Sequence, residues 1–302
     1  MDLSWLRGVF PPIPTPFTND GSVATPVQAF LEHLRDGGLD GVVALGSNGE
    51  APQLTDTERT AWIGAIRASL PAPLRLIAGT GADSTRATIE RTRAAAAVGA
   101  EAVLVLAPMY FRRDMTLEAV RAHYHSVADA SPIPVLIYNV PVFMGWDIPD
   151  AWIPAIAEHP NVRGLKDSSG RTERLVGLRS AVGPGFVLLA GAGDKMVDAI
   201  ASGADGAIAA LANVAPAACA TIRREMVAGR IEVARARQAE VAPVGEALGR
   251  TAGVARLKAA LRLQGYDHGD PRAPVPRLPD SELPALRRLL EAAQLLPSAL
   301  PA

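Results

Sequence analysis

Two stretches, Pro134-Val-Leu-Ile-Tyr138 and Val162-Arg-Gly-Leu-Lys166, decide the fold. Each is a short, mainly apolar run that does not alternate with polar residues, which is typical of a strand buried on both faces. Between them, residues 150–159 carry apolar side chains at the spacing of a helix. A strand, a helix and a second strand in this order predict one unit of a parallel sheet.

The same alternation extends over most of the chain. Further strands are expected at residues 8–14, 41–45, 74–78, 102–106, 186–190 and 206–210. Helices are expected at residues 26–36, 55–69, 84–98, 116–130, 172–181, 195–202 and 215–227, the second of them opened by the capping-box pattern Thr55-Asp-Thr-Glu58. Eight strands alternating with eight helices predict an α/β fold, the (β/α)8 TIM barrel. A doubly wound sheet is less suited, because the first strand leads into Thr15-Pro-Phe-Thr-Asn-Asp-Gly21, which is no phosphate loop.

The last part of the chain has a different character. Beyond about residue 225 the strand signals stop, and residues 230–248, 253–263 and 280–293 are predicted to be helices. The connection Gly265-Tyr-Asp-His-Gly-Asp-Pro-Arg-Ala-Pro274 is rich in Gly and Pro, as loops are. We therefore expect residues 1–225 to form the barrel with the active site and residues 226–302 to form a helical domain.

Composition excludes several classes of protein. The 302 residues carry a net charge of −1, which gives no reason to expect nucleic acid or an anionic membrane as a partner. The start, Met-Asp-Leu-Ser-Trp-Leu-Arg7, lacks the features of a signal or transit peptide, and no apolar stretch is long enough to span a membrane. A cytoplasmic protein is expected. The single cysteine, Cys219, cannot form an internal disulfide and is interpreted as a core residue.

Lysine is rare in this chain. Of 30 Lys and Arg residues, the lysines are Lys166, Lys195 and Lys258 alone, and the other 27 are Arg. Arg stays protonated and cannot act as an amine nucleophile, so a chain that uses Arg almost everywhere can keep Lys where an amine is needed. Chance retention is the alternative for any one of them.

The barrel fold itself selects among these lysines, because barrel enzymes place catalytic groups at the C-terminal ends of the strands. Lys166 ends one expected strand and Tyr138 ends the strand before it. A buried amine could attack a carbonyl, and a phenol beside it could transfer protons. The alternative for Lys166 is an ion pair with Asp167 or another carboxylate. Lys195 at a helix start is interpreted as solvated, and Lys258 in mid-helix as paired or packed.

Two glycine-rich turns also follow strands. Gly46-Ser-Asn-Gly-Glu50 offers backbone N–H groups and short polar side chains that suit a carboxylate, although a plain turn is an equal alternative. Gly191-Ala-Gly193 is a weak phosphate signal that a tight turn explains equally well. The five His residues are scattered, and no metal site is predicted.

These residues resemble the dihydrodipicolinate synthase / N-acetylneuraminate lyase family of class I aldolases. The resemblance covers nearly the whole chain and rests on Gly8-Val-Phe-Pro-Pro-Ile-Pro-Thr-Pro-Phe17, Gly46-Ser-Asn-Gly-Glu50, Ala78-Gly-Thr-Gly81, Tyr138-Asn-Val-Pro141, Gly164-Leu-Lys-Asp-Ser168, Ala212-Asn-Val214 and Leu257-Lys258. It implies a pyruvate-dependent lyase that forms an imine on lysine, needs no metal or organic cofactor, and assembles as a homotetramer or dimer.

The resemblance also implies roles for single residues. Lys166 matches the lysine that forms the imine with pyruvate, and Tyr138 matches the tyrosine that moves protons. The pair that binds the pyruvate carboxylate corresponds to Ser47 and Asn48, next to Gly46. The remaining matches are Ile208, whose carbonyl would line the site, and Tyr110, which in some members reaches into the neighbouring subunit.

The second substrate is the open point. Members that make dihydrodipicolinate usually carry Arg shortly after Asn-Val-Pro, where this chain has Phe143. Segments such as Ser131-Pro-Ile-Pro134, His159-Pro-Asn161 and Arg272-Ala-Pro274 are more similar to 4-hydroxy-2-oxoglutarate aldolases, which release pyruvate and the aldehyde glyoxylate. The alternatives are a synthase that condenses pyruvate with aspartate semialdehyde, a sugar-acid aldolase or dehydratase, and a 2-oxo-acid-binding module without turnover. The intact pair of Lys166 and Tyr138 argues against the last of these.

Overall fold

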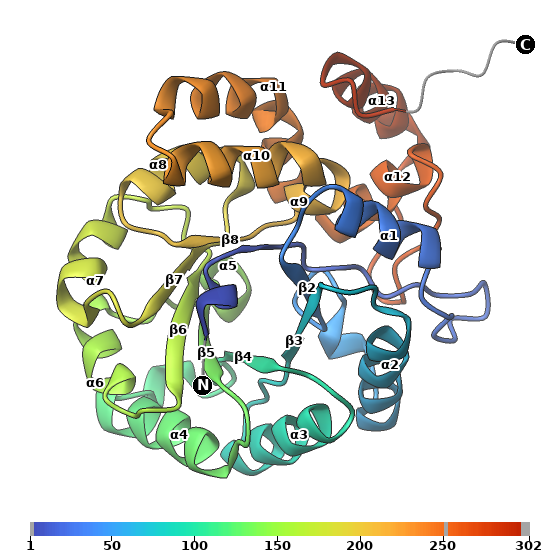
Figure 1. The fold of residues 1–302 in the computed structure, drawn as a ribbon. Coiled ribbons are helices and arrows are strands. Elements are labelled where there is room, and N and C mark those ends of the chain that lie inside the picture. The colour runs from blue at the N-terminus through green and yellow to red at the C-terminus, as the bar shows by residue number, and fades with distance from the viewer. Residues whose placement is uncertain (1–2, 251–252, 297–302) are drawn as a thin grey trace, which may run out of the picture.

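Eight parallel strands form a ring in the computed structural model, which describes residues 3–250 and 253–296 (Figure 1). The order is β1-β8-β7-β6-β5-β4-β3-β2. The strands are β1 (Val9–Phe10), β2 (Gly41–Ala44), β3 (Arg75–Gly79), β4 (Ala102–Leu106), β5 (Val135–Asn139), β6 (Val162–Asp167), β7 (Val187–Ala190) and β8 (Gly206–Ile208). Hydrogen bonds from Ile13 N to Val43 O (3.0 Å) and from Val43 N to Pro11 O (2.9 Å) join β2 to the segment that directly follows β1 and so close the ring. The predicted barrel is confirmed.

Helices surround the ring and add a helical region at the end of the chain (Figure 1). The helices are α1 (Gln28–Asp36), α2 (Asp56–Ser69), α3 (Thr85–Ala97), α4 (Leu117–Ala130), α5 (Pro141–Met144), α6 (Ile153–Ala157), α7 (Arg174–Val182), α8 (Met196–Ala201), α9 (Leu211–Val214), α10 (Pro216–Val227), α11 (Ile231–Gly249), α12 (Gly253–Leu263) and α13 (Leu283–Ala292). Short 3-10 turns are η1 (Ser4–Leu6), η2 (Ala51–Gln53), η3 (Arg112–Asp114), η4 (Asp150–Trp152), η5 (Gly193–Lys195) and η6 (Asp280–Glu282). None of the helices described here has the length and apolarity that a membrane span requires.

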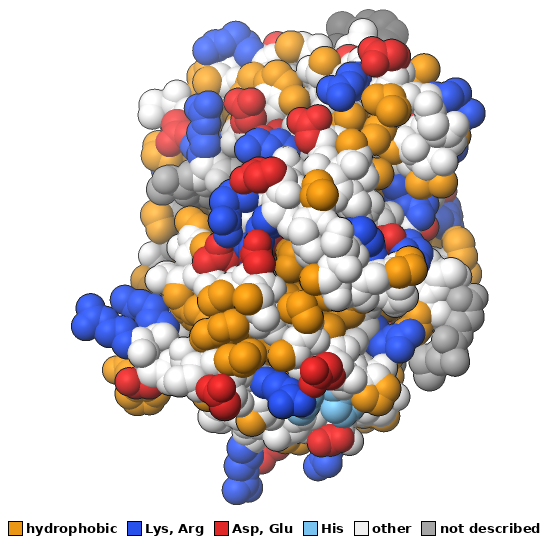
Figure 2. Space-filling model, turned by 90° about the vertical axis from the view of Figure 1, so that its left-hand side faces the viewer, with side chains coloured by type: hydrophobic (Ala, Val, Ile, Leu, Met, Phe, Trp, Pro, Cys, Tyr) orange, Lys and Arg blue, Asp and Glu red, His pale blue; other side chains and the backbone are white. Residues whose placement is uncertain are grey.

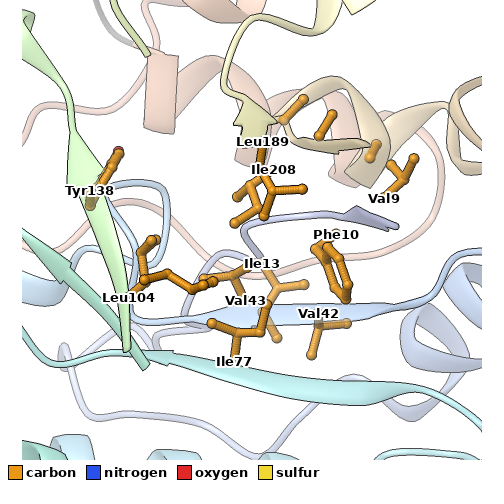
Figure 3. Close-up of a cluster of buried hydrophobic side chains, with 14 of the residues drawn as sticks. Val9, Phe10, Ile13, Val42, Val43, Ile77, Leu104, Tyr138, Leu189 and Ile208 are labelled. Atoms are coloured by element: carbon orange, nitrogen blue, oxygen red, sulfur yellow. The ribbon is translucent and has the colours of Figure 1, made fainter. Parts of the chain in front are cut away.

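The core lies inside the ring of strands. Figure 3 shows apolar side chains from opposite sides of the ring converging there, among them Phe10, Val43, Ile77, Leu104, Leu189 and Ile208. All of these are almost completely buried. Tyr138 lies at the margin of the same cluster (Figure 3). Functional groups must therefore gather at the ends of the strands.

The C-terminal helices support the loops at that end. Gln238 of α11 donates from Nε2 to Gly193 O (3.1 Å) in the loop after β7. A Cβ atom at Gly245 of α11 would lie 3.0 Å from Asp194 N, so the helix lies directly against this loop. The helical region therefore contacts one of the loops that surround the barrel mouth.

Candidate active site

Lys166 and Tyr138 are direct neighbours across two strands. The register of β5 and β6 pairs Tyr138 with Lys166, and both side chains are buried, with 6% and 4% exposure. Lys166 Nζ lies 4.3 Å from the centre of the Tyr138 ring. The amine and the phenol that the sequence singled out therefore share one face of the sheet at the end of the strands.

The sequence left open an ion pair between Lys166 and Asp167, and this interpretation is wrong. Consecutive residues of a strand point to opposite faces, so Asp167 faces away from the barrel interior. Its carboxylate accepts from Arg174 Nη1 at 3.1 Å and from Asn139 Nδ2 at 2.7 Å. In the part of the chain that the structure describes, no carboxylate lies within ion-pair distance of Lys166 Nζ.

A buried polar network stands behind this pair. Asn139 and Asp167, which follow Tyr138 and Lys166 along their strands, are also paired in register. Arg174 joins them to the next loop through Asp147 Oδ1 (2.9 Å). Burial acts to lower the pKa of the Arg174 guanidinium, but its carboxylate neighbours outweigh burial and raise it. The network holds the ends of β5 and β6 in fixed register.

The turn after β2 faces the same site. It is bounded by Leu45 and Glu50, two non-glycine residues in the left-handed region, with φ of 57° and 53°. Thr15 Oγ1 donates to Gly49 O (2.6 Å) and so anchors the turn. Within the described ranges, the backbone N–H groups of Ser47 and Asn48 have no hydrogen-bond partner. Such unpaired N–H groups in a turn form an anion-binding concavity.

A hydroxyl contact connects this turn to the tyrosine. Ser47 Oγ lies 3.1 Å from Tyr138 Oη, so the two hydroxyls can share a proton. Sequence reasoning assigned Ser47 to carboxylate binding alone and missed this contact. The signal available was that both residues stand at the ends of strands, where side chains converge.

The other predicted residues are more dispersed. The Ile208 side chain is fully buried in the core at the end of β8, next to Leu189 in Figure 3. Tyr110 is 77% exposed and stacks edge-on against Phe111, with ring centres 5.0 Å apart. Its backbone N–H donates to Asp83 Oδ1 (2.9 Å), so the loop is anchored while the ring projects outward.

The two remaining lysines lie in the environments that the sequence predicted, one solvated and the other paired. Lys195 is exposed and donates to Gly170 O (3.2 Å). Lys258 is buried and paired with Glu50 at 2.7 Å. Burial raises the pKa of the Cys219 thiol to about 12, in agreement with a core residue.

Packing accounts for the Gly191–Gly193 turn. A Cβ atom at Gly191 would lie 2.0 Å from Ser168 Oγ, and one at Gly193 would lie 2.7 Å from Leu211 Cβ. The glycines are therefore required by close approach, and a phosphate is not needed to explain them. Over residues 3–250 and 253–296, no three His, Cys, Asp or Glu side chains are grouped so that they could hold a metal ion.

Comparisons with known proteins agree with this geometry. The model of the dihydrodipicolinate synthetase family matches residues 5–293. A protein of Emericella nidulans named probable 4-hydroxy-2-oxoglutarate aldolase, mitochondrial, is 39% identical over 274 residues, which is 89% of this chain and 88% of that protein.

Solved structures give the same result. The dihydrodipicolinate synthase of Acinetobacter baumannii in complex with pyruvate has a TM-score of 0.91 at 31% identity and covers 96% of this chain and 99% of its own. YagE of E. coli K12 in complex with pyruvate has a TM-score of 0.90 at 28% identity, covering 95% and 98%. With a family model that matches almost the whole chain, a relative at 39% identity and these structures, the chain belongs to the dihydrodipicolinate synthetase family of pyruvate-dependent class I aldolases.

Proposed function

We propose that this protein cleaves 4-hydroxy-2-oxoglutarate to pyruvate and glyoxylate through an imine on Lys166. The observation that carries the proposal is the buried Lys166 amine, which has no carboxylate partner in the described structure and lies 4.3 Å from the Tyr138 ring. An amine that is not held in an ion pair is available to attack a carbonyl carbon.

The proposed reaction uses the groups already described. The Lys166 amine adds to the 2-oxo carbon, and Tyr138 gives its proton to the departing hydroxyl, so that loss of water leaves a protonated imine and the Tyr138 phenolate. The C3–C4 bond then breaks, its electron pair moves into the imine to form an enamine, and the C4 hydroxyl loses its proton to Tyr138 as glyoxylate leaves. Protonation of the enamine at C3 and hydrolysis release pyruvate and the free amine.

The remaining site residues bind and orient in this proposal. The unpaired N–H groups of Ser47 and Asn48, in the turn that Gly46 begins, receive the carboxylate next to the imine. Ser47 also relays the proton through its 3.1 Å contact with Tyr138. The Ile208 carbonyl lines the site. The reaction needs no metal or organic cofactor, because the protonated imine is itself the electron sink.

The second substrate is proposed from two observations. Phe143 in α5 is 60% exposed, so an apolar side chain stands where the family's synthases usually carry Arg. The Emericella nidulans relative carries the name of a 4-hydroxy-2-oxoglutarate aldolase. The alternative is a synthase activity, condensation of pyruvate with aspartate semialdehyde; the Acinetobacter baumannii neighbour is named a dihydrodipicolinate synthase.

A substrate panel separates these activities. We expect glyoxylate release from 4-hydroxy-2-oxoglutarate to exceed, in kcat/KM, both condensation of pyruvate with aspartate semialdehyde and cleavage of sugar-derived 2-oxo acids. Faster condensation with aspartate semialdehyde would overturn the choice of substrate and leave the imine on Lys166 in place.

We also propose that the active form is a homotetramer or dimer in which Tyr110 reaches the site of a neighbouring subunit. Tyr110 and Phe111 support this, because their rings are 77% and 65% exposed and lie together, and contiguous exposed apolar surface is typical of interaction sites. Figure 2 shows apolar side chains gathered into a patch on the flank formed by α6 and α7, with charges of both signs around it. A monomer with full activity would contradict the role of Tyr110.

A cytoplasmic location stays a prediction. The Emericella nidulans relative is named as mitochondrial.

A further inference from the structure

Glu50 and Lys258 form a buried ion pair between the barrel and the C-terminal helices. Glu50 Oε1 lies 2.7 Å from Lys258 Nζ, and the two side chains are 2% and 1% exposed. Lys258 stands in α12, far along the chain from the turn after β2. Buried charges are costly unless they are paired with good geometry, so a pair kept at this position needs an explanation.

Both partners have further contacts. Glu50 Oε2 accepts from the backbone N–H of Arg272 at 2.8 Å. Lys258 Nζ donates to Asp270 O at 3.1 Å and lies 4.4 Å from the centre of the Phe17 ring. Burial lowers the pKa of the Lys258 amine, and Glu50 acts against this. The carboxylate of Glu50 is thus held from two sides by the C-terminal region.

The ion pair affects the site through the backbone conformation of Glu50. Glu50 has a φ of 53°, which is strained for a residue with a side chain. Strained conformations persist only where the surroundings hold them. Glu50 N donates to Ser47 O (3.1 Å) and so closes the turn whose Ser47 and Asn48 N–H groups are unpaired.

We propose that Glu50 and Lys258 are positioning residues that hold the turn at 46–49 in the conformation that receives the substrate carboxylate. The pair does this from outside the pocket, by fixing the end of the turn to α12. The inference rests on the proposed function, since it assumes that the turn binds the carboxylate of a 2-oxo acid.

The test measures pyruvate binding and turnover separately. Borohydride trapping at increasing pyruvate concentrations gives the half-saturating concentration, and cleavage of 4-hydroxy-2-oxoglutarate gives kcat and KM. For Lys258→Met we expect half-saturation to rise about tenfold, equivalent to about 1.4 kcal/mol of binding free energy. We expect kcat to change by less than about threefold, because the carboxylate is held equally in the ground state and in the transition state.

Arg256→Met is the matched control. Arg256 stands on the same helix and pairs with Glu282 of the C-terminal region, whereas Lys258 pairs with the barrel. The double variant Glu50→Gln/Lys258→Met removes both charges, so its thermal stability should recover towards the wild type while half-saturation stays raised. Glu50→Gln alone keeps the side-chain volume and should raise half-saturation in the same direction, which provides the test if Lys258→Met does not fold.

Two results would overturn the inference. One is unchanged half-saturation in a folded Lys258→Met or Glu50→Gln protein. The other is an equal rise in the Arg256→Met control, which would indicate a general loss of stability. Failure of the wild-type protein to be trapped by pyruvate would instead contradict the proposed function.

Discussion

Removal of one oxygen atom tests the proposed proton transfer. Tyr138→Phe keeps the ring that lies 4.3 Å from Lys166 Nζ and removes the hydroxyl that lies 3.1 Å from Ser47 Oγ. Since the ring remains, the packing of the barrel mouth and the contact with the amine should persist. The substitution therefore separates proton transfer from the positioning of the lysine.

The expected sizes of the two effects differ greatly. Loss of a neutral hydrogen bond costs about 0.5–1.5 kcal/mol of stability. A general acid-base group contributes about 100- to 10,000-fold to the rate, which is ~3–5 kcal/mol of barrier. We therefore expect kcat to fall by at least about 100-fold while the unfolding free energy changes by about 1 kcal/mol.

Tyr124→Phe provides the matched control. Tyr124 is also buried, on helix α4 outside the ring of strands; its hydroxyl donates to Val105 O at 3.0 Å and bonds the backbone, not the phenol, of Tyr138. It should lose comparable stability and keep the wild-type kcat. Steady-state pyruvate release and urea unfolding measure both quantities. A Tyr138→Phe enzyme with kcat within about threefold of the wild type would refute the role of the phenol.

Three further substitutions test the buried contacts that stabilise the barrel. Asp167→Asn leaves a buried guanidinium short of one counter-ion and should cost about 3 kcal/mol in urea unfolding, and an unchanged midpoint would contradict this. Gly79→Ala places a Cβ atom 2.0 Å from Leu45 O, so we expect about 1–3 kcal/mol of destabilisation and weaker pyruvate trapping. The control is Gly177→Ala, which has open space around it and should be neutral or stabilising. Burial lowers the pKa of His123 from 6.5 to about 4, so the unfolded chain binds the proton more readily. The contribution of His123 to stability should be fully present above pH 6.5 and fall by about 3 kcal/mol as the pH drops to 4. Burial also lowers the pKa of His268 to about 4, so His123→Gln should remove only part of the slope in unfolding experiments, and an unchanged slope would contradict the role of His123.

The fold and the central pair could be predicted because both follow from local patterns. A run of apolar residues that ends in Tyr138 and another that ends in Lys166 indicate adjacent parallel strands, and parallel strands end at the same edge. The short helices α5 and α9 were not predicted, since four residues are too few to show a helical period.

Contacts between distant parts of the chain could not be predicted in the same way. Ser47 lies in the turn after β2 and Tyr138 lies in β5, two strands that are not neighbours, so only the curvature of the barrel brings their hydroxyls to 3.1 Å. Lys258 was expected to pair or pack, but its partner Glu50 depends on how the helical region docks on the barrel. Phe143 was visible in the sequence as a departure from the family, and its exposure required the structure.

The most direct measurement is borohydride reduction of the wild-type protein in the presence of pyruvate, followed by peptide mass mapping. We expect one adduct, on Lys166, with Lys195 and Lys258 unmodified. Lys166→Arg should give no adduct, because Arg keeps the positive charge but cannot form the imine. An adduct on another lysine, or none on the wild-type protein, would contradict the assignment of Lys166 as the imine-forming residue.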